Sequence, residues 1–126
     1  MSHMVVQELI IKDLDLLEKI CQKLGFNFQR NKKSAKYYGG NTKKCDHTIT
    51  IPGTNNEIAL IRQTDGSYRM EADFYGTEGK TVKESVGKIT QQYTIEATKR
   101  AVRKKGYSIL EQWLEDGSCD IQIMID

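Results

Sequence analysis

Apolar residues recur between Thr81 and Gly106 with the period of an α-helix. They are spaced three or four residues apart, which places them on one side of a helix: Val82, Val86, Ile89, Tyr93, Ala97 and Ala101. Thr81 and Glu84 have the spacing of a capping box, and Gly106 follows a run of basic residues that suits a helix end. The pattern predicts a long amphipathic helix over residues 81–105.

The N-terminal part of the chain predicts a β-α-β unit. Residues 5–11 alternate as in a strand, and Asp13 can cap a helix that Gly25 ends. The apolar positions of that helix are Leu14, Leu17, Ile20, Cys21 and Leu24. Phe26 and Phe28 alternate with polar residues in a strand that follows directly.

The rest of the chain is rich in hairpin signals. Residues 46–51 alternate as a strand, residues 57–63 and 67–74 flank Asp65-Gly66, and residues 107–114 and 119–125 flank Asp116-Gly117. Both predicted helices end in Lys, Gly and an aromatic residue, which indicates either a second β-α-β unit or a common way of ending a helix. We therefore expect an α+β fold in one domain, 1–126: a mainly antiparallel sheet of about seven or eight strands, two helices on one face, and ferredoxin-like β-α-β elements elaborated by hairpins.

Composition supports a folded, water-soluble chain. Hydrophobic residues make up 38% and charged residues 29% of the 126 residues, with one proline. No apolar run approaches the length of a membrane span, and the N-terminus has no signal-peptide pattern. We expect a cytoplasmic protein with no membrane contact and no cofactor.

Residues 30–44 form the candidate binding segment. The net charge of +2 does not by itself indicate a polyanion partner, but here cations surround two aromatic residues. Cations can bind phosphates while an aromatic ring stacks on a base, so nucleic-acid binding is one alternative. The other is a solvated loop whose lysines protect an edge strand. The candidate residues are Arg30, Lys32, Lys33, Lys36, Tyr37, Tyr38, Lys43 and Lys44.

The cysteines offer a weaker metal alternative. Their number is odd and their spacing irregular, which excludes a disulfide framework and a CxxC zinc pair. Cys21 is expected to be a small buried residue. Cys45 and His47 form a C-x-H pair on a predicted strand, where positions i and i+2 share a face and could supply two metal ligands. A four-ligand site would need two more, and His3 and Cys119 are the candidates.

Several short motifs resemble a known family over the whole chain. They are Met1-Ser2-His3, Leu24-Gly25-Phe26, Tyr38-Gly39-Gly40 with Thr42 and Asp46, Glu71-Ala72-Asp73, Gln91-Gln92-Tyr93 and Lys105-Gly106-Tyr107. The chain resembles the family of the chloroplast hypothetical open reading frame thirty-five, which occurs in cyanobacteria and plastids and has no settled activity. The family usually has a phenylalanine after the histidine, where this chain has Met4. The resemblance implies a small accessory protein whose partner is an ATPase or a ferredoxin-like protein, and it carries over no functional residues.

No catalytic motif is present, since hydrolase, zincin, P-loop and dinucleotide patterns are all missing from the sequence. We expect a non-catalytic accessory protein that binds another protein through an uncovered sheet face or through residues 30–44. Tyr107 and Trp113 are expected to pack inside the fold, whereas an exposed Trp113 would indicate a partner surface.

Overall fold

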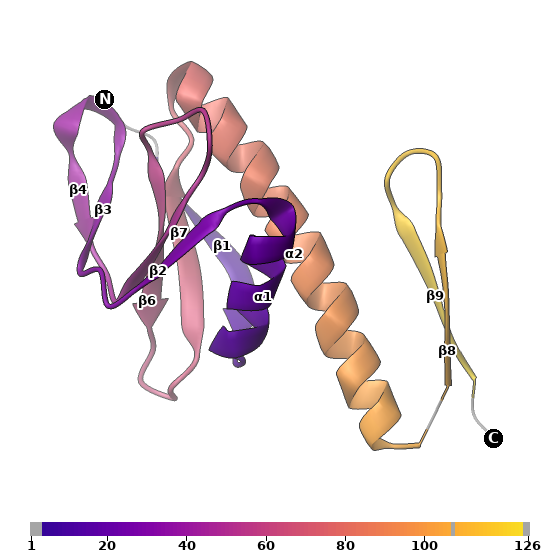
Figure 1. The fold of residues 1–126 in the computed structure, drawn as a ribbon. Coiled ribbons are helices and arrows are strands. Elements are labelled where there is room, and N and C mark those ends of the chain that lie inside the picture. The colour runs from indigo at the N-terminus through magenta and orange to yellow at the C-terminus, as the bar shows by residue number, and fades with distance from the viewer. Residues whose placement is uncertain (1–3, 107, 125–126) are drawn as a thin grey trace. The chain divides into compact units, whose positions relative to one another are not determined.

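The computed structural model describes residues 4–106 and 108–124 (Figure 1). It divides into two compact units, Met1–Gln91 and Gln92–Asp126. The division falls within the long helix, so each unit is described by itself.

The first unit contains most of the secondary structure. Its elements are β1 (Met4–Ile11), α1 (Leu14–Leu24), β2 (Asn27–Arg30), β3 (Ser34–Lys36), a 3-10 turn (Tyr38–Gly40), β4 (Thr42–Lys44), β5 (His47–Thr50), β6 (Glu57–Arg62) and β7 (Tyr68–Asp73). Helix α2 (Gly76–Lys104) begins in this unit and continues into the second. There β8 (Ser108–Trp113) pairs with β9 (Cys119–Met124).

The main sheet is five-stranded and antiparallel throughout, in the order β1-β7-β6-β5-β2. Strands β3 and β4 form a separate two-stranded sheet, and so do β8 and β9. The predicted α+β class is confirmed. The prediction of one sheet with seven or eight strands is wrong for the described residues, because both extra hairpins pair only within themselves.

The first predicted β-α-β unit is present. Successive antiparallel pairings make β1 and β2 run in the same direction at opposite edges of the sheet, and α1 connects them. The second unit is not formed among the described strands, because β8 follows α2 but pairs with β9.

Helix α1 begins and ends where the sequence predicts. The Oδ1 atom of Asp13 accepts from the Leu16 N–H at 3.0 Å, and Gly25 takes the left-handed conformation with φ 83°. The N–H of Phe26 then donates to the Cys21 carbonyl at 2.8 Å, which completes the helix stop. The buried residues of α1 are Leu16, Leu17, Ile20 and Cys21. The packed face therefore includes Leu16, whereas the sequence pattern had included Leu14.

Helix α2 begins at Gly76, so the predicted start at Thr81 with a capping box is wrong. Gly76 and Gly79 read as loop residues because glycine has low helix propensity. In the structure, a Cβ on Gly79 would lie 2.1 Å from the Phe74 carbonyl carbon, so the first turn packs against the backbone of Phe74 in a way that only glycine allows. The carboxylate of Asp73 accepts from the Tyr75 N–H at 3.0 Å just before the helix.

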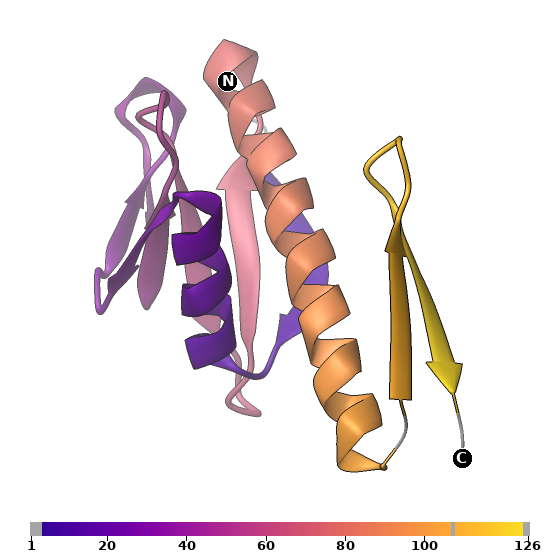
Figure 2. The ribbon, with the colours of Figure 1, turned by 45° about the vertical axis from the view of Figure 1, so that its right-hand side comes forward.

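The core of the first unit lies between one sheet face and the two helices. Helix α1 and the first half of α2 lie on the same side of the sheet (Figure 2). The predicted stripe on α2 is buried from Val82 to Tyr93, but Ala97 is half-buried and Ala101 is exposed. The sheet contributes Phe28, Ile49, Ile58, Leu60 and Met70. Beyond Tyr93, the buried residues of α2 are Ile95 and Val102.

Candidate functional site

The sheet face opposite the helices is covered over β6 and β7 by the β3–β4 hairpin. The prediction that this face is uncovered is therefore wrong for these two strands. Side chains alternate along strands, so Ala59 and Ile61 point away from the helix-facing Ile58 and Leu60. Ala59 forms a buried cluster with Ala35, Tyr37 and Cys45, against which Ile61 packs. The β3–β4 hairpin therefore uses residues of the basic segment to cover this face.

Lys32 of the hairpin pairs with a buried carboxylate. Its Nζ atom lies 2.9 Å and 2.7 Å from the two carboxylate oxygens of Glu57, whose side chain is 4% exposed. The Lys36 N–H and the Thr50 hydroxyl also donate to Glu57, each at 3.0 Å. Burial alone would raise the pKa of Glu57, but the hydrogen bonds from Lys32, Lys36 and Thr50 outweigh it and lower the pKa.

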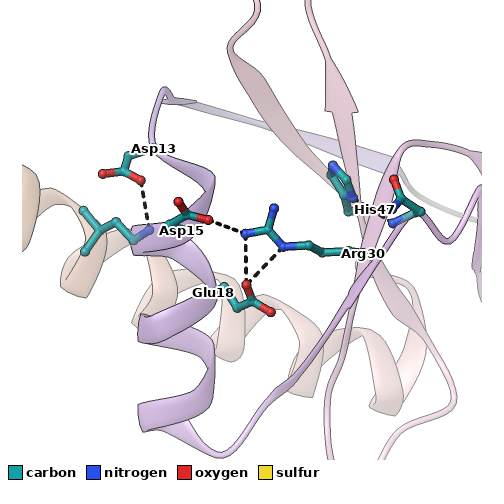
Figure 3. A network of polar contacts seen from close by, with 7 residues as sticks. Asp13, Asp15, Glu18, Arg30 and His47 are labelled. Atoms are coloured by element: carbon teal, nitrogen blue, oxygen red, sulfur yellow. Dashed lines mark hydrogen bonds and ion pairs between the residues drawn. The ribbon is translucent and has the colours of Figure 1, made fainter.

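Two more cations of the segment also form ion pairs. Lys43 Nζ lies 3.2 Å from the Glu71 carboxylate, which is buried on β7 and also contacts Arg69 at 3.4 Å. Arg30 reaches the other side of the sheet, where its guanidinium pairs with Asp15 at 2.6 Å and Glu18 at 2.9 Å on α1 (Figure 3). These cations hold elements of the fold together.

The other predicted binding residues differ in their exposure. Tyr37 is 3% exposed, and burial raises the pKa of its phenol. Tyr38 is 40% exposed and its ring lies 4.5 Å from that of Tyr75. Exposed side chains remain on Lys33, Lys36 and Lys44. Nucleic-acid binding by the segment stays a prediction. Of its two tyrosines, Tyr38 is exposed and Tyr37 is buried, so Tyr37 is not available to stack on a base.

Cys45 and His47 lie on opposite faces of the sheet, which corrects the expected shared face. Cys45 precedes β5 and belongs to the cluster under the hairpin, where its Sγ donates to the Lys32 carbonyl at 3.3 Å. His47 is paired in register with the helix-facing Leu60, and its Nδ1 accepts from the Asn31 N–H at 2.9 Å (Figure 3). Burial lowers the pKa of His47, and the neighbouring Arg30 adds to this.

Within the described ranges, no group of three or more His, Cys, Asp or Glu side chains is placed to hold a metal ion. His3, one of the two further ligands considered, lies outside the described residues, as do Met1-Ser2 and Tyr107. Cys119 belongs to the second unit. Cys21 is fully buried as expected, and burial, with Glu18 nearby, raises the pKa of its thiol to about 12.

The second unit exposes an apolar surface on the β8–β9 hairpin. Trp113 is 46% exposed, so the expectation that it packs inside the fold is wrong. Its indole N–H donates to Glu111 at 2.7 Å, and Glu111 also pairs with Lys99 of α2. The other large apolar side chains exposed here are Leu110, Leu114, Ile123 and Met124.

Both faces of this hairpin carry exposed apolar side chains. Alternation and strand register place Trp113 and Ile123 on one face and Leu110 and Met124 on the other. Residues 108–124 contain no lysine or arginine, and their acidic residues are Glu111, Glu115, Asp116 and Asp120. The surface is therefore apolar with an acidic border. In the sequence analysis, Trp113 was the residue that indicated a partner surface here.

A family model described as Protein of unknown function (DUF1257) matches residues 20–121. The chain belongs to this family. The match spans α1 to β9 and includes both units. Searches of curated proteins and of solved structures found no match. None of the described helices has the length and apolar character to cross a membrane.

Proposed function

We propose that this protein is a non-catalytic accessory module that binds another protein through the β8–β9 hairpin. The observation that carries the proposal is the exposure of Trp113 together with Leu110, Leu114, Ile123 and Met124 on one small sheet. Large apolar side chains exposed on both faces of one hairpin indicate an interaction site in a water-soluble protein. Tryptophan is also enriched among the residues that dominate binding energy.

The charge of the hairpin defines the chemistry of the partner. Acidic residues border the apolar side chains and residues 108–124 hold no cation. The complementary surface is an apolar groove with lysine or arginine at its rim. A cytoplasmic ATPase or ferredoxin-like protein, the partners implied by the resemblance to the chloroplast hypothetical open reading frame thirty-five family, should be tested first.

The test compares wild type with a double variant, Trp113→Ser with Met124→Ser, which removes one exposed side chain from each face. The control is Ile10→Ser, which alters a residue that is 60% exposed on β1 in the other unit. Partners captured from native extract are identified, purified and titrated by calorimetry. We expect the double variant to bind at least about tenfold more weakly, which corresponds to about 1.4 kcal/mol, and the control to bind as wild type.

A second readout uses the single tryptophan of the chain. Binding at the hairpin should shift the emission of Trp113 to shorter wavelength as the partner removes water from the indole. High salt should weaken binding, because the acidic border lies at the solvated rim. A partner that binds the double variant and wild type equally, with no change in emission, would show that the hairpin is not the binding surface.

A further inference from the structure

A polar cleft of about 420 Å³ opens in the first unit. Its lining residues are distant in sequence from the β8–β9 hairpin. Its walls come from the turn between β3 and β4, the loop before β6 and the first turn of α2. The volume is that of a site for a small molecule. The cleft is lined by amides, hydroxyls, one carboxylate and one lysine: Asn41, Thr42, Asn55, Asn56, Glu78 and Lys36, beside Tyr37.

Asn56 supplies the observation that points to a ligand. The residue is 2% exposed, and its own N–H donates to the Thr54 hydroxyl at 3.0 Å. Its side-chain Nδ2 is buried, and no described residue accepts a hydrogen bond from it. A buried amide donor without an acceptor is unfavourable, so an oxygen atom of a bound molecule would stabilise this arrangement.

Glu78 adds a fixed acceptor to the same cleft. Its Oε1 accepts from the Asn55 N–H at 2.9 Å, which ties the first turn of α2 to the loop that carries Asn56. A carboxylate and a side-chain amide in one cleft offer acceptors and donors together, and vicinal hydroxyl groups use both.

An aromatic pair borders this arrangement. Glu78 also lines a neighbouring cleft of about 580 Å³, together with Tyr38 and Tyr75. The two rings lie 4.5 Å apart and tilted by 57°, and Tyr38 is exposed. An exposed ring offers an apolar face to the C–H groups of a sugar ring. Gly39 and Gly40, which line the first cleft, have no side chain to block a ligand.

We propose that this cleft binds a small polyhydroxylated molecule through vicinal hydroxyl groups. One hydroxyl oxygen accepts from Asn56 Nδ2 and a hydroxyl hydrogen donates to the Glu78 carboxylate. The ring of the ligand extends past Glu78 into the neighbouring cleft and packs against Tyr38. Vicinal hydroxyls of this kind occur in free sugars and in the ribose of a nucleoside.

The experiment is an amide chemical-shift titration of the full chain. The probes are a hexose, a disaccharide, adenosine and 2′-deoxyadenosine, each up to about 10 mM, so that dissociation constants near 1 mM are measured. We expect saturable shifts for residues 37–42, 55–56 and 77–78. Binding of adenosine without 2′-deoxyadenosine identifies ribose as the source, and binding of the hexose or disaccharide identifies a sugar. No saturable shift with any probe would overturn the proposal.

Variants test the two polar contacts separately. Asn56→Ala removes the unpartnered donor, and Glu78→Gln removes the charge at a half-buried position while keeping the shape. Each should weaken binding at least about tenfold. The control, Asn27→Ala, removes an exposed amide on β2 and should leave binding unchanged. Because Asn56 is buried, Glu78→Gln also tests the site if Asn56→Ala does not fold. Unchanged affinity in Glu78→Gln would overturn the assigned geometry.

Discussion

Gly25 and Gly87 occupy opposite backbone conformations, so the same substitution should have opposite effects. Gly25 has φ 83° at the end of α1, a conformation that an alanine side chain disfavours. Gly87 lies in α2, is exposed, and has open space where a Cβ would go. We expect Gly25→Ala to lower the free energy of unfolding by about 1 kcal/mol and Gly87→Ala to raise it by about 0.5–1 kcal/mol.

Urea unfolding monitored by circular dichroism measures both changes. Both variants add the same methyl group, so a difference between their effects reports the backbone conformation at the two positions. A stabilising Gly25→Ala would contradict the left-handed helix stop.

Some residues could be predicted from their neighbours in sequence and others could not. The Asp13 cap, the Gly25 stop and the buried Cys21 depend on positions within one helix, and the structure confirms them. The partner of Lys32 lies 25 positions away, on β6. A local pattern of lysines and tyrosines reads as an exposed surface, because it holds no information about the buried Glu57 that neutralises one of those lysines.

At the scale of elements, the hairpin turns were predictable and the order of pairing was not. Asp65-Gly66 and Asp116-Gly117 each join two strands, as their turn chemistry indicates. The short strands β3 and β4 were missed, since three-residue strands rich in lysine carry little alternation. The start of α2 was also missed, because the need for glycine at position 79 arises from the backbone of Phe74 and not from helix propensity.

The ion pair between Lys32 and Glu57 should hold the β3–β4 hairpin on the sheet. Lys32→Met keeps the apolar stem but leaves the Glu57 carboxylate buried without its main counter-charge. We expect a loss of about 1–3 kcal/mol in the free energy of unfolding at pH 7. Lys44→Met, at an exposed position of β4, is the matched control and should change stability by less than about 0.5 kcal/mol.

The difference in the free energy of unfolding between wild type and Lys32→Met should depend on pH. The folded pKa of Glu57 is lowered below its ordinary value of 4.5, so its contribution is present above pH 4.5 and is lost as pH falls through the folded pKa. In Lys32→Met the folded pKa should rise, so the variant should differ most from wild type near neutral pH and least in acid. Urea unfolding from pH 3 to pH 7 measures the difference, and a gap that widens in acid would contradict the pairing.

At the scale of the whole molecule, the two units differ in what supports their strands. In the first, β6 and β7 each pair on both edges and have buried side chains on the face toward the helices. In the second, β8 and β9 pair only with each other among the described strands and expose large apolar side chains. A two-stranded hairpin is only marginally stable in water, so opening should cost less free energy in β8–β9 than in β6–β7.

Hydrogen exchange read by mass spectrometry tests this difference in the intact chain. We expect peptides from β8–β9 to exchange at least about tenfold faster than those from β6–β7, which corresponds to about 1.4 kcal/mol between the opening free energies. A partner that covers the hairpin should slow exchange in β8–β9 and leave β6–β7 unchanged, because only the hairpin loses its open edges. Equal protection of both pairs in the free protein would mean that the hairpin is already stabilised within the chain and needs no partner.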